Sequence, residues 1–473
     1  MITLGVVLEV LTGKTSRWAD QIIADVGIDS RTLIPGSMFV AMQGETADGH
    51  DYVSQAFENG ASFALIDRSV DPQLRVIDCR PGSDIDLDQE VEVPFCLLVE
   101  DSLKALQRVA GEWRKRLDLR VIAITGSVGK TTTKEVTTTV LKQRYRTLKN
   151  SGNLNNEIGL PMTLWRLSSG HQRAVLEMGF YVPGEIEFLC ELAQPVVGVL
   201  TTIGTVHAER AGSQDEIARG KSELVQALPA GPEGVAILNY DDERVRAMAD
   251  LTQARIFYYG LSPNADLWAD EVEGLGLDGI KFRLNYQGES IYLKVPLIGR
   301  HSVHTVLRAA AVGLIEGMTW EEIGRGLRSE HTQLRLVAVR SSSGALILDD
   351  TYNASPKSML ADLNLLEEMD GRKIAVLGDM LELGRYEHQG HMKVGIRAAE
   401  VADVLVTVGE RANIIARAAA ENKLKQERIH SFAESTDVIP FLNEFLQEND
   451  VVLVKGSRGM RMDKIVSALE VGS

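Results

Sequence analysis

The sequence predicts an α/β protein of three domains, and three observations carry this prediction. The chain has 473 residues, which is too long for a single hydrophobic core. Short apolar runs alternate with helix-like segments from residue 121 onward, as they do in mostly parallel sheets. A glycine-containing loop separates one of these runs from the helical segment after it. We place boundaries near 100 and 330, which gives a small N-terminal α/β domain (1–100), a central P-loop domain with a mostly parallel sheet (101–330) and a C-terminal Rossmann-like domain (331–473).

Composition and charge limit the possible function classes. Hydrophobic residues make up 44% and charged residues 25% of the chain, which is typical of a soluble globular protein. The net charge of −16 argues against nucleic-acid binding, because that function needs a basic surface. No apolar run approaches the roughly 20 residues of a membrane span, and no signal-peptide pattern opens the sequence. Cys79, Cys96 and Cys190 are odd in number and far apart, so we expect buried thiols and a cytoplasmic location.

The first part of the chain has a regular order of predicted elements. They are a turn at 29–31, a strand at 38–42, a polar loop at 44–52, a helix at 53–59 and a strand at 61–66. From the residues alone, Ser30, Arg31 and His50 are interpreted as turn and surface residues. The acidic segment 80–92 has few large side chains and is predicted to be an exposed excursion.

The second part opens with the strongest motif in the sequence. A helical pattern at 101–117 leads into a buried strand at 121–124, and a helical segment at 133–144 follows the loop. The loop between them reads Thr125-Gly126-Ser127-Val128-Gly129-Lys130-Thr131-Thr132. Glycines before a helix let backbone N–H groups surround an anion, and the helix dipole favours negative charge. We predict a phosphate site in which Lys130 reaches the β- and γ-phosphates and Thr131 binds Mg²⁺. The spacing is two residues shorter than the general P-loop pattern, so a plain glycine turn is the alternative.

Polar residues that end parallel strands are further candidates, because open α/β sheets bind ligands at the carboxyl ends of their strands. Glu177 ends a predicted strand at 174–177, where it would complete the Mg²⁺ shell or orient a water molecule. His207 follows a predicted strand at 196–201, and Lys221 lies on the next helix. A structural histidine and a surface lysine are the alternatives for these two residues.

The remaining middle segment combines a polar loop with further elements. The loop at 150–161 holds four asparagines and two glycines, which indicates either dense hydrogen bonding to a polar ligand or a plain turn. Strands are predicted at 235–239, 281–284 and 290–295, and a helix rich in alanine runs from Ser302 through 313.

The third part repeats the alternation of strands and helices. Strands are predicted at 345–350, 373–378, 404–408 and 451–454. The first ends in Asp349 and Asp350 and is followed by the turn that holds Tyr352 and Asn353, and Asp379 follows the second. No G-x-G-x-x-G follows any of these strands, so no nicotinamide cofactor is expected.

Together these motifs resemble those of the Mur ligase family, the ATP-dependent amide ligases of peptidoglycan synthesis, nearly from end to end. The segments that carry the resemblance are 125–132, 153–161, 177–179, 207–213, Lys221, 349–356, 377–384 and 455–458. The segments 349–356 and 377–384 are most similar to the members that join D-alanyl-D-alanine to UDP-N-acetylmuramoyl-tripeptide.

The resemblance implies ATP and Mg²⁺ as cofactors and these two substrates as partners of a monomeric enzyme. For the UDP sugar and the rest of the substrate it implies Ser30, Arg31, Gly44, Asp48, His50, Asn155, Asn156 and Asp379. For the nucleotide it implies residues 125–132 with His301, Arg335, Asp350, Tyr352 and Asn353. For catalysis and metal binding it implies Lys130, Thr131, Glu177, His207 and Lys221. Lys221 would bind metal as a carbamate, which forms only from a neutral amine.

The sequence also departs from the family pattern. The helix after Gly299 usually carries two asparagines, one of which contacts adenine, but here those places hold Ser302 and Thr305. Leu334 precedes Arg335 where glycine is common, and 80–92 resembles an insertion.

The predicted function is therefore an ATP-dependent ligase that forms an amide through an acyl phosphate. The alternatives are a sister ligase that adds a single amino acid, folylpolyglutamate synthetase, a P-loop NTPase without ligase activity and a non-catalytic nucleotide-binding scaffold. The sequence leaves open whether lysine or diaminopimelate is the third residue of the tripeptide.

Overall fold

Three separate sheets organise the chain, as the α/β prediction requires. The computed structural model describes residues 1–15, 20–44, 47–83, 92–205, 208–329 and 337–470. Their strands form sheets of five, nine and six strands, and each sheet falls within one of the three predicted segments. Packing groups the chain into two compact units: residues 1–123, 145–179 and 184–196 in one, and 124–144, 180–183 and 197–473 in the other. The predicted boundaries near 100 and 330 are not unit boundaries, and they stay predictions.

The N-terminal sheet has the strand order β1-β2-β3-β5-β4, and all neighbouring strands in it pair in parallel. The strands are β1 (Val26–Gly27), β2 (Met38–Val40), β3 (Phe63–Ile66), β4 (Val76–Asp78) and β5 (Phe95–Leu98). The helices of this part are α1 (Leu4–Thr12), α2 (Val53–Glu58) and α3 (Ser102–Lys115). Helix α3 begins where the Asp101 carboxylate accepts a hydrogen bond from the Lys104 N–H, and it buries Leu106 and Val109. The predicted helices at 53–59 and 101–117 are thus confirmed to within two residues at each end.

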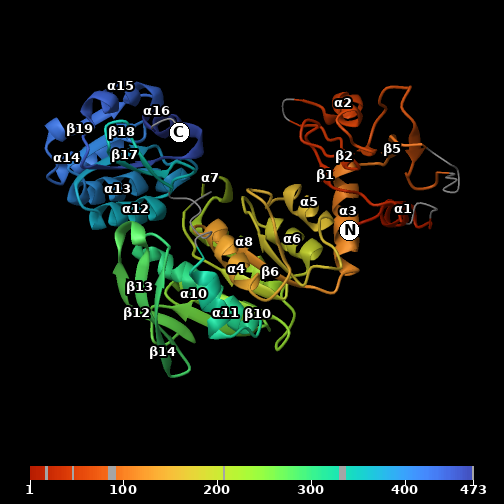
Figure 1. Cartoon of the computed structure of the whole chain (residues 1–473), viewed down its shortest axis with the longest axis horizontal. Helices are drawn as coiled ribbons and strands as arrows, with labels where there is room; N and C mark the ends of the chain where they lie inside the picture. The colour runs from red at the N-terminus through yellow and green to blue at the C-terminus, as the bar shows by residue number, and fades with distance from the viewer. Residues whose placement is uncertain (16–19, 45–46, 84–91, 206–207, 330–336, 471–473) are drawn as a thin grey trace. The chain divides into compact units, whose positions relative to one another are not determined.

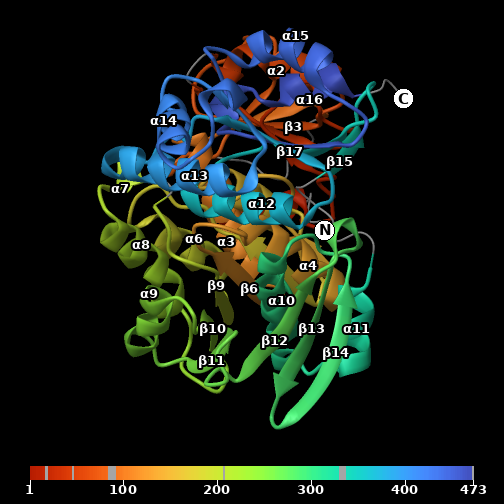
Figure 2. The ribbon, with the colours of Figure 1, turned by 90° about the vertical axis from the view of Figure 1, so that its left-hand side faces the viewer.

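The nine-stranded sheet has the order β14-β13-β12-β11-β10-β9-β6-β8-β7. Its strands are β6 (Arg120–Thr125), β7 (Thr147–Lys149), β8 (Arg173–Glu177), β9 (Val197–Leu200), β10 (Val235–Asn239), β11 (Arg255–Gly260), β12 (Leu267–Gly274), β13 (Ile280–Tyr286) and β14 (Glu289–Val295). Strands β9 to β12 pair in parallel, whereas β12, β13 and β14 form an antiparallel meander whose strands run side by side in Figure 2. Gly279, with a φ of +96°, lies just before β13, where a β-carbon would collide with the Val295 carbonyl oxygen. The mostly parallel sheet is confirmed, with an antiparallel extension at one edge.

The helices of the same part cover this sheet. They are α4 (Lys130–Leu141), α5 (Gly159–Trp165), α6 (Glu185–Ala193), α7 (Ala208–Ala211), α8 (Gln214–Gln226), α9 (Glu243–Arg246), α10 (Val303–Ile315) and α11 (Trp320–Leu327). Helices α10 and α11 approach α4 closely because glycines face Val140. A β-carbon on Gly326 would lie 2.5 Å from the Val140 Cα, and one on Gly313 would lie 3.3 Å from its Cγ1. Small residues at this contact hold α4, and with it the end of the predicted phosphate loop, in place.

The C-terminal sheet has the order β15-β16-β20-β17-β18-β19, in which only β15 pairs antiparallel. Its strands are β15 (Val337–Arg340), β16 (Leu346–Asp350), β17 (Arg372–Gly378), β18 (Val404–Val408), β19 (Ile429–Phe432) and β20 (Asp450–Lys455). The helices, labelled in blue tones in Figure 1, are α12 (Pro356–Glu368), α13 (Glu387–Val401), α14 (Asn413–Glu421), α15 (Ser435–Phe445) and α16 (Asp463–Leu469).

Two apolar clusters lie on opposite faces of this sheet. Alternate residues of β17 belong to different clusters. Ala375 and Leu377 belong to the cluster under α12 to α14, whereas Ile374 and Val376 belong to the cluster under α15 and α16. A strand buried on both faces reads as a continuous apolar run, which is the pattern in the sequence. The Rossmann-like prediction for this part is confirmed.

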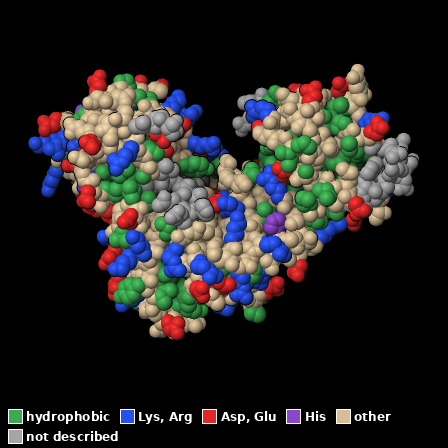
Figure 3. All heavy atoms as spheres, viewed as in Figure 1, with side chains coloured by type: hydrophobic (Ala, Val, Ile, Leu, Met, Phe, Trp, Pro, Cys, Tyr) green, Lys and Arg blue, Asp and Glu red, His purple; other side chains and the backbone are tan. Residues whose placement is uncertain are grey.

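The cysteines are buried, as the sequence predicts, and charges of both signs lie on the surface. Cys79, Cys96 and Cys190 are all free and buried. Acidic and basic side chains are interspersed on the face that Figure 3 shows. None of the helices in the described residues is both long and apolar enough to cross a bilayer.

Candidate active site

The predicted phosphate loop, residues 125–132, extends from the end of β6 into the start of α4. Helix α4 begins at Lys130, about one turn before the helix that the sequence predicts at 133–144. Gly126 and Gly129 have φ values of +142° and +83°, and Gly129 is the N-cap of α4. The loop is tied to its neighbours by two hydrogen bonds: the Ser127 N–H donates to the Thr202 carbonyl at 2.8 Å, and the Gly204 N–H donates to Ser127 Oγ at 2.8 Å. Lys130 is the first helical residue, and its Nζ donates to the Gly126 carbonyl at 2.9 Å. The ammonium therefore lies across the loop that the sequence predicts to bind phosphate.

The surroundings of this loop fit an anionic ligand. A β-carbon on Gly126 would collide with Thr201 Oγ1, so only glycine lets the backbone run so close to β9. The Thr201 and Thr202 hydroxyls are buried and have no hydrogen-bond partner among the described residues. The first turn of a helix presents backbone N–H groups and the positive end of the dipole to an anion. The residues present thus fit a phosphate chain, and Thr131 supplies a hard oxygen ligand suited to Mg²⁺.

Glu177 is the last residue of β8, as predicted, and an asparagine network fixes it. The Asn150 side chain donates to the Glu177 carbonyl at 3.0 Å and accepts from the Glu177 N–H at 2.9 Å. Asn155 Nδ2 donates to Glu177 Oε1 at 3.0 Å, and the Gly179 N–H donates to the Asn155 carbonyl. Asn156 Oδ1 accepts from the Gly159 N–H at the start of α5. The asparagine loop is indeed dense in hydrogen bonds, and those that the structure shows hold the protein's own carboxylate and helix.

Lys221 lies in α8 and is only 1% exposed, so the interpretation as a surface lysine is wrong. Its Nζ lies 4.6 Å from the centroid of the Phe180 ring, and Gly220 provides the space for that ring. His207 lies outside the described residues. Within the described part of the chain, no cluster of three or more histidine, cysteine or acidic residues suits a metal ion.

In the C-terminal sheet, Asp350 and Lys455 end the paired strands β16 and β20. Lys455 is 1% exposed, and its Nζ forms ion pairs with Asp350 and with Asp362 of α12, the latter at 2.9 Å. Burial is the largest effect on the Asp362 carboxyl, and it raises the pKa of that group. This ion pair could not be predicted from the sequence, because a lysine at the end of a strand is expected to be exposed.

The residues that follow Asp350 form a capped turn. Asp349 Oδ1 accepts from the Thr351 N–H, and Asn353 Oδ1 accepts from the Ala354 N–H. Tyr352 is 45% exposed between them. Arg335 lies outside the described residues.

Asp379, predicted to bind substrate, is 3% exposed, and its hydrogen bonds hold the loop that follows β17. Its Oδ1 accepts from the Ala412 N–H at 2.7 Å, and its carbonyl accepts from the Ser457 N–H. His391, which sequence reasoning missed, is fully buried and accepts from the next residue of the same loop, Met380, at 3.0 Å.

Two positions near the start of α10 depart from the family pattern, and the side chains at both form hydrogen bonds within the protein. His301 lies in the short turn Arg300–Ser302, against Gly299, whose φ is +80°. Ser302 Oγ donates to the Ile298 carbonyl at 2.7 Å, and Thr305 Oγ1 accepts from Arg308 at 2.8 Å.

The N-terminal candidates divide into exposed and buried groups. Arg31 is exposed and pairs with Asp29 through two hydrogen bonds, which lowers the pKa of Asp29 to about 2. Ser30 is 6% exposed and donates to Gln55 Oε1 at 2.8 Å, so its interpretation as a surface residue is wrong. Gly44 donates its N–H to the Ala47 carbonyl.

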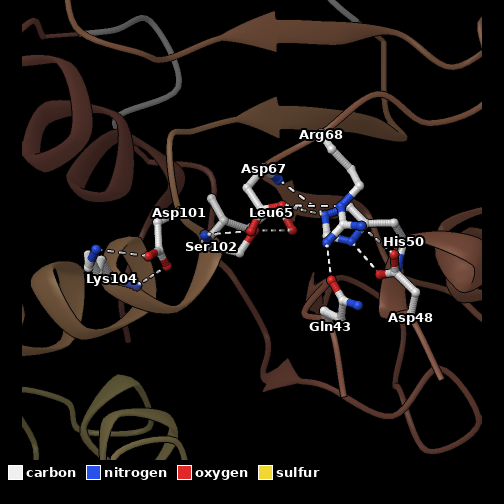
Figure 4. Close-up of polar contacts among 9 residues, drawn as sticks. All are labelled: Gln43, Asp48, His50, Leu65, Asp67, Arg68, Asp101, Ser102 and Lys104. Carbon is white, nitrogen blue, oxygen red and sulfur yellow. Dashed lines mark hydrogen bonds and ion pairs between the residues drawn. The ribbon is translucent and has the colours of Figure 1, made fainter. Parts of the chain in front are cut away.

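His50 is buried as well, and both of its ring nitrogens are used within the protein (Figure 4). Nδ1 lies 2.7 Å from Asp48 Oδ1, and Nε2 accepts from the Asp67 N–H at 3.2 Å. Arg68 contacts Asp48 at 2.7 Å. These residues lie beside a cavity of about 290 Å³ that Asp48, His50 and Arg68 help to line. The geometry assigns His50 to holding the loop, and leaves Arg68 and Asp48 beside the cavity.

Three family models match the chain. They are the Mur ligase family catalytic domain over residues 22–112, the Mur ligase middle domain over 124–313 and the Mur ligase glutamate ligase domain over 334–458. Among similar proteins, the UDP-N-acetylmuramoyl-tripeptide–D-alanyl-D-alanine ligase of Bacillus subtilis (strain 168) is 34% identical over 457 residues, covering 96% of this chain and 94% of the relative. The ligase of the same name from Escherichia coli (strain K12) is 35% identical, covering 99% of this chain and 98% of the relative.

Solved structures give the same result. A crystal structure of MurF from Acinetobacter baumannii has a TM-score of 0.83 and 32% identity, and 98% of each chain is covered. MurF ligase from Thermotoga maritima in complex with ADP has a TM-score of 0.78 and 27% identity, covering 95% of this chain and 98% of that one. Since the family models and the full-length relatives together cover the described sheets, the chain belongs to the Mur ligase family.

Proposed function

We propose that this chain is an ATP-dependent ligase that joins D-alanyl-D-alanine to UDP-N-acetylmuramoyl-tripeptide. The observation that carries the proposal is the phosphate loop at the start of α4, found in a chain that is 34–35% identical from end to end to ligases with this activity. The bound ADP of the Thermotoga maritima relative supports ATP as the nucleotide.

The reaction follows from the chemistry of the two substrates. A carboxylate resists attack because its charge repels nucleophiles and O²⁻ cannot leave. Transfer of the γ-phosphoryl group of ATP to the peptide carboxylate forms an acyl phosphate and ADP. The amine of D-alanyl-D-alanine then attacks the acyl carbon, and the tetrahedral intermediate expels phosphate, leaving an amide and a released proton. The protein must position the groups and exclude water, since an acyl phosphate otherwise hydrolyses.

We assign the predicted residues to this reaction as follows. Lys130 and the α4 N-terminus bind the triphosphate. Thr131 and Glu177 provide oxygen ligands for Mg²⁺, which when bound neutralises phosphate charge. Asn155 orients the Glu177 carboxylate through its 3.0 Å hydrogen bond. His207 and a carbamylated Lys221 are proposed for a second metal ion.

The substrate roles of the outer domains are part of the same proposal. Ser30, Arg31, Gly44 and Asp48 belong to the nucleotide-sugar site, and Asp350, Tyr352 and Asn353 belong to the nucleotide site. Asp379 acts on the dipeptide pocket by fixing its loop. The monomeric state and the cytoplasmic location stay predictions.

The test is phosphate release from ATP with each acceptor in turn. We expect turnover only when both UDP-N-acetylmuramoyl-tripeptide and D-alanyl-D-alanine are present, and little with D-alanine or D-glutamate in place of the dipeptide. Lys130→Met should lower kcat/KM at least a hundredfold, because the variant loses charge stabilisation of the transferred phosphoryl group. Lys142→Met, at the exposed end of the same helix, is the control and should retain activity.

Two results would contradict the proposal. Turnover without an acceptor amine would indicate an NTPase, and equal turnover with a single amino acid would indicate a sister ligase.

A further inference from the structure

A buried arginine on α10 lies beside the phosphate loop. Arg308 is 4% exposed, and its Nη2 donates to Thr305 Oγ1 at 2.8 Å. Its guanidinium carbon lies 5.7 Å from the centroid of the Tyr259 ring. A β-carbon built on Gly129 would lie 3.3 Å from Nη2, so the charge is adjacent to the N-cap of α4.

The guanidinium of Arg308 lacks a counter-ion among the residues that the structure describes. Its Nε has no hydrogen-bond partner, and no carboxylate forms an ion pair with it within the described part of the chain. A buried cation without an anion costs several kcal/mol, and the cost falls when an anion binds. The contacts of the guanidinium with Thr305 and with the Tyr259 side chain involve neutral groups, which leaves the charge uncompensated.

A second buried arginine shows what a purely structural role requires. Arg114 of α3 is 6% exposed and also lacks a carboxylate partner in the described residues. Its Nε, Nη1 and Nη2 donate to the carbonyls of Ala193, Leu117 and Leu119 at 3.0–3.1 Å. All three nitrogens of Arg114 are therefore occupied by protein acceptors, whereas Nε of Arg308 is not.

We propose that Arg308 is a second cationic ligand of the nucleotide phosphate chain, donating to a phosphate oxygen beside Gly129 while Lys130 acts from within the loop. The proposal rests on the proposed ATP-dependent function. Nε and Nη2 lie on one side of the guanidinium and together form the fork that matches the oxygens of a phosphate group. The position next to the positive end of α4 adds to the attraction for an anion rather than for a neutral group.

The test compares nucleotide binding with intrinsic stability. Arg308→Met removes the charge at similar length, and Arg308→Lys keeps the charge without the fork. We expect Arg308→Met to raise the Kd for Mg²⁺-ADP about 10- to 100-fold in calorimetry, since charge-assisted hydrogen bonds contribute on that scale. Arg308→Lys should lie between Arg308→Met and the unmodified protein, and the Kd for adenosine should not change. The melting temperature without nucleotide should stay the same or rise, because a buried charge has been removed.

Arg325→Met is the matched control, since Arg325 lies on α11 with an exposed ion pair to Glu321 and should leave the Kd for ADP unchanged. Unchanged ADP affinity in Arg308→Met would overturn the proposal. An equal loss for adenosine would do the same, because it would assign Arg308 to the base. If Arg308→Met does not fold, Arg308→Gln provides the same comparison. Absence of ADP binding to the unmodified protein would instead contradict the proposed function itself.

Discussion

At the scale of residues, the His50 ring connects two segments of the chain, because each of its nitrogens contacts a different one. Nδ1 lies 2.7 Å from the Asp48 carboxylate, and Nε2 lies 3.2 Å from both the backbone N–H and the carboxylate of Asp67. The hydrogen bond from His50 lowers the pKa of Asp48, so this carboxylate is charged at neutral pH. The backbone of Asp48 also forms an isolated antiparallel β-bridge with Gln43. The ring therefore ties the proposed nucleotide-sugar loop to the end of β3.

Two substitutions of His50 test its two contacts separately. Asparagine places its amide near the position of Nδ1, whereas glutamine places it near Nε2. We expect His50→Gln to raise the KM for the nucleotide-sugar peptide about three- to tenfold, because the Asp48 end of the loop loses its hydrogen bond. His50→Asn should have a smaller effect, and neither variant should change the KM for ATP. Initial-rate kinetics with each substrate varied in turn measures this difference. A larger KM in His50→Asn than in His50→Gln would contradict the role of the Asp48 contact.

At the scale of elements, the joint between β17 and α13 depends on a second buried histidine. His391 of α13 accepts from the Met380 N–H after β17, and its Nδ1 lies 2.8 Å from the Glu387 carbonyl, to which it donates. Burial lowers the pKa of His391, with the Arg411 charge acting in the same direction and Asp379 and Glu387 opposing it. Protonation of Nε2 would remove the acceptor for Met380 and loosen the loop that holds Asp379.

This pKa shift predicts how stability depends on pH. The pKa of His391 is depressed in the folded state relative to about 6.5 in the unfolded chain, so its contribution is present above pH 6.5 and is lost as the pH falls below that value. His391→Gln should cost about 1–2 kcal/mol at pH 7.5 and should show a smaller loss between pH 7.5 and 5.5. Urea unfolding of both proteins at the two pH values measures this, with Asp379, Glu387 and Arg411 common to both. An equal pH dependence in the two proteins would rule out the assigned role.

At the scale of the whole molecule, the N-terminal and C-terminal sheets have separate hydrophobic clusters. The C-terminal sheet holds a buried cation, Lys455, between the carboxylates of Asp350 and Asp362. Because Lys455 lies at the end of β20 and Asp362 on α12, this ion pair links strand and helix in the centre of one sheet. Breaking the pair should therefore weaken that sheet locally.

Hydrogen exchange can localise this effect. Lys455→Met leaves two carboxylates without their cation, which costs about 3–5 kcal/mol in buried sites. We expect faster exchange in β16, β17 and β20 and unchanged exchange in β2 and β3. Adding Asp362→Asn to the same variant should restore part of the protection, since one of the unpaired charges is then gone. Uniformly faster exchange in all sheets would contradict a local role.

Local patterns predicted most of the fold and part of the site. Glu177 ends β8 as expected, because a buried parallel strand followed by an acid has a clear signature in sequence. The environments of Lys221, Arg308 and Lys455 could not be predicted in the same way. Each is a basic residue whose burial depends on partners far along the chain, such as Phe180 for Lys221 and Asp362 for Lys455. Periodicity describes which face of an element is apolar, but it carries no information on pairs that form only when separate elements meet.

Burial of the three cysteine thiols affects their reactivity towards oxidants and alkylating reagents. Burial raises the pKa of Cys79 and of Cys96 to about 12, and Cys190 contacts Met178 sulfur at 3.7 Å within the core. At pH 7 the side chains of Cys79 and Cys96 are then almost entirely in the unreactive thiol form. In the folded enzyme Cys79 and Cys96 are therefore poor targets for peroxide and iodoacetamide.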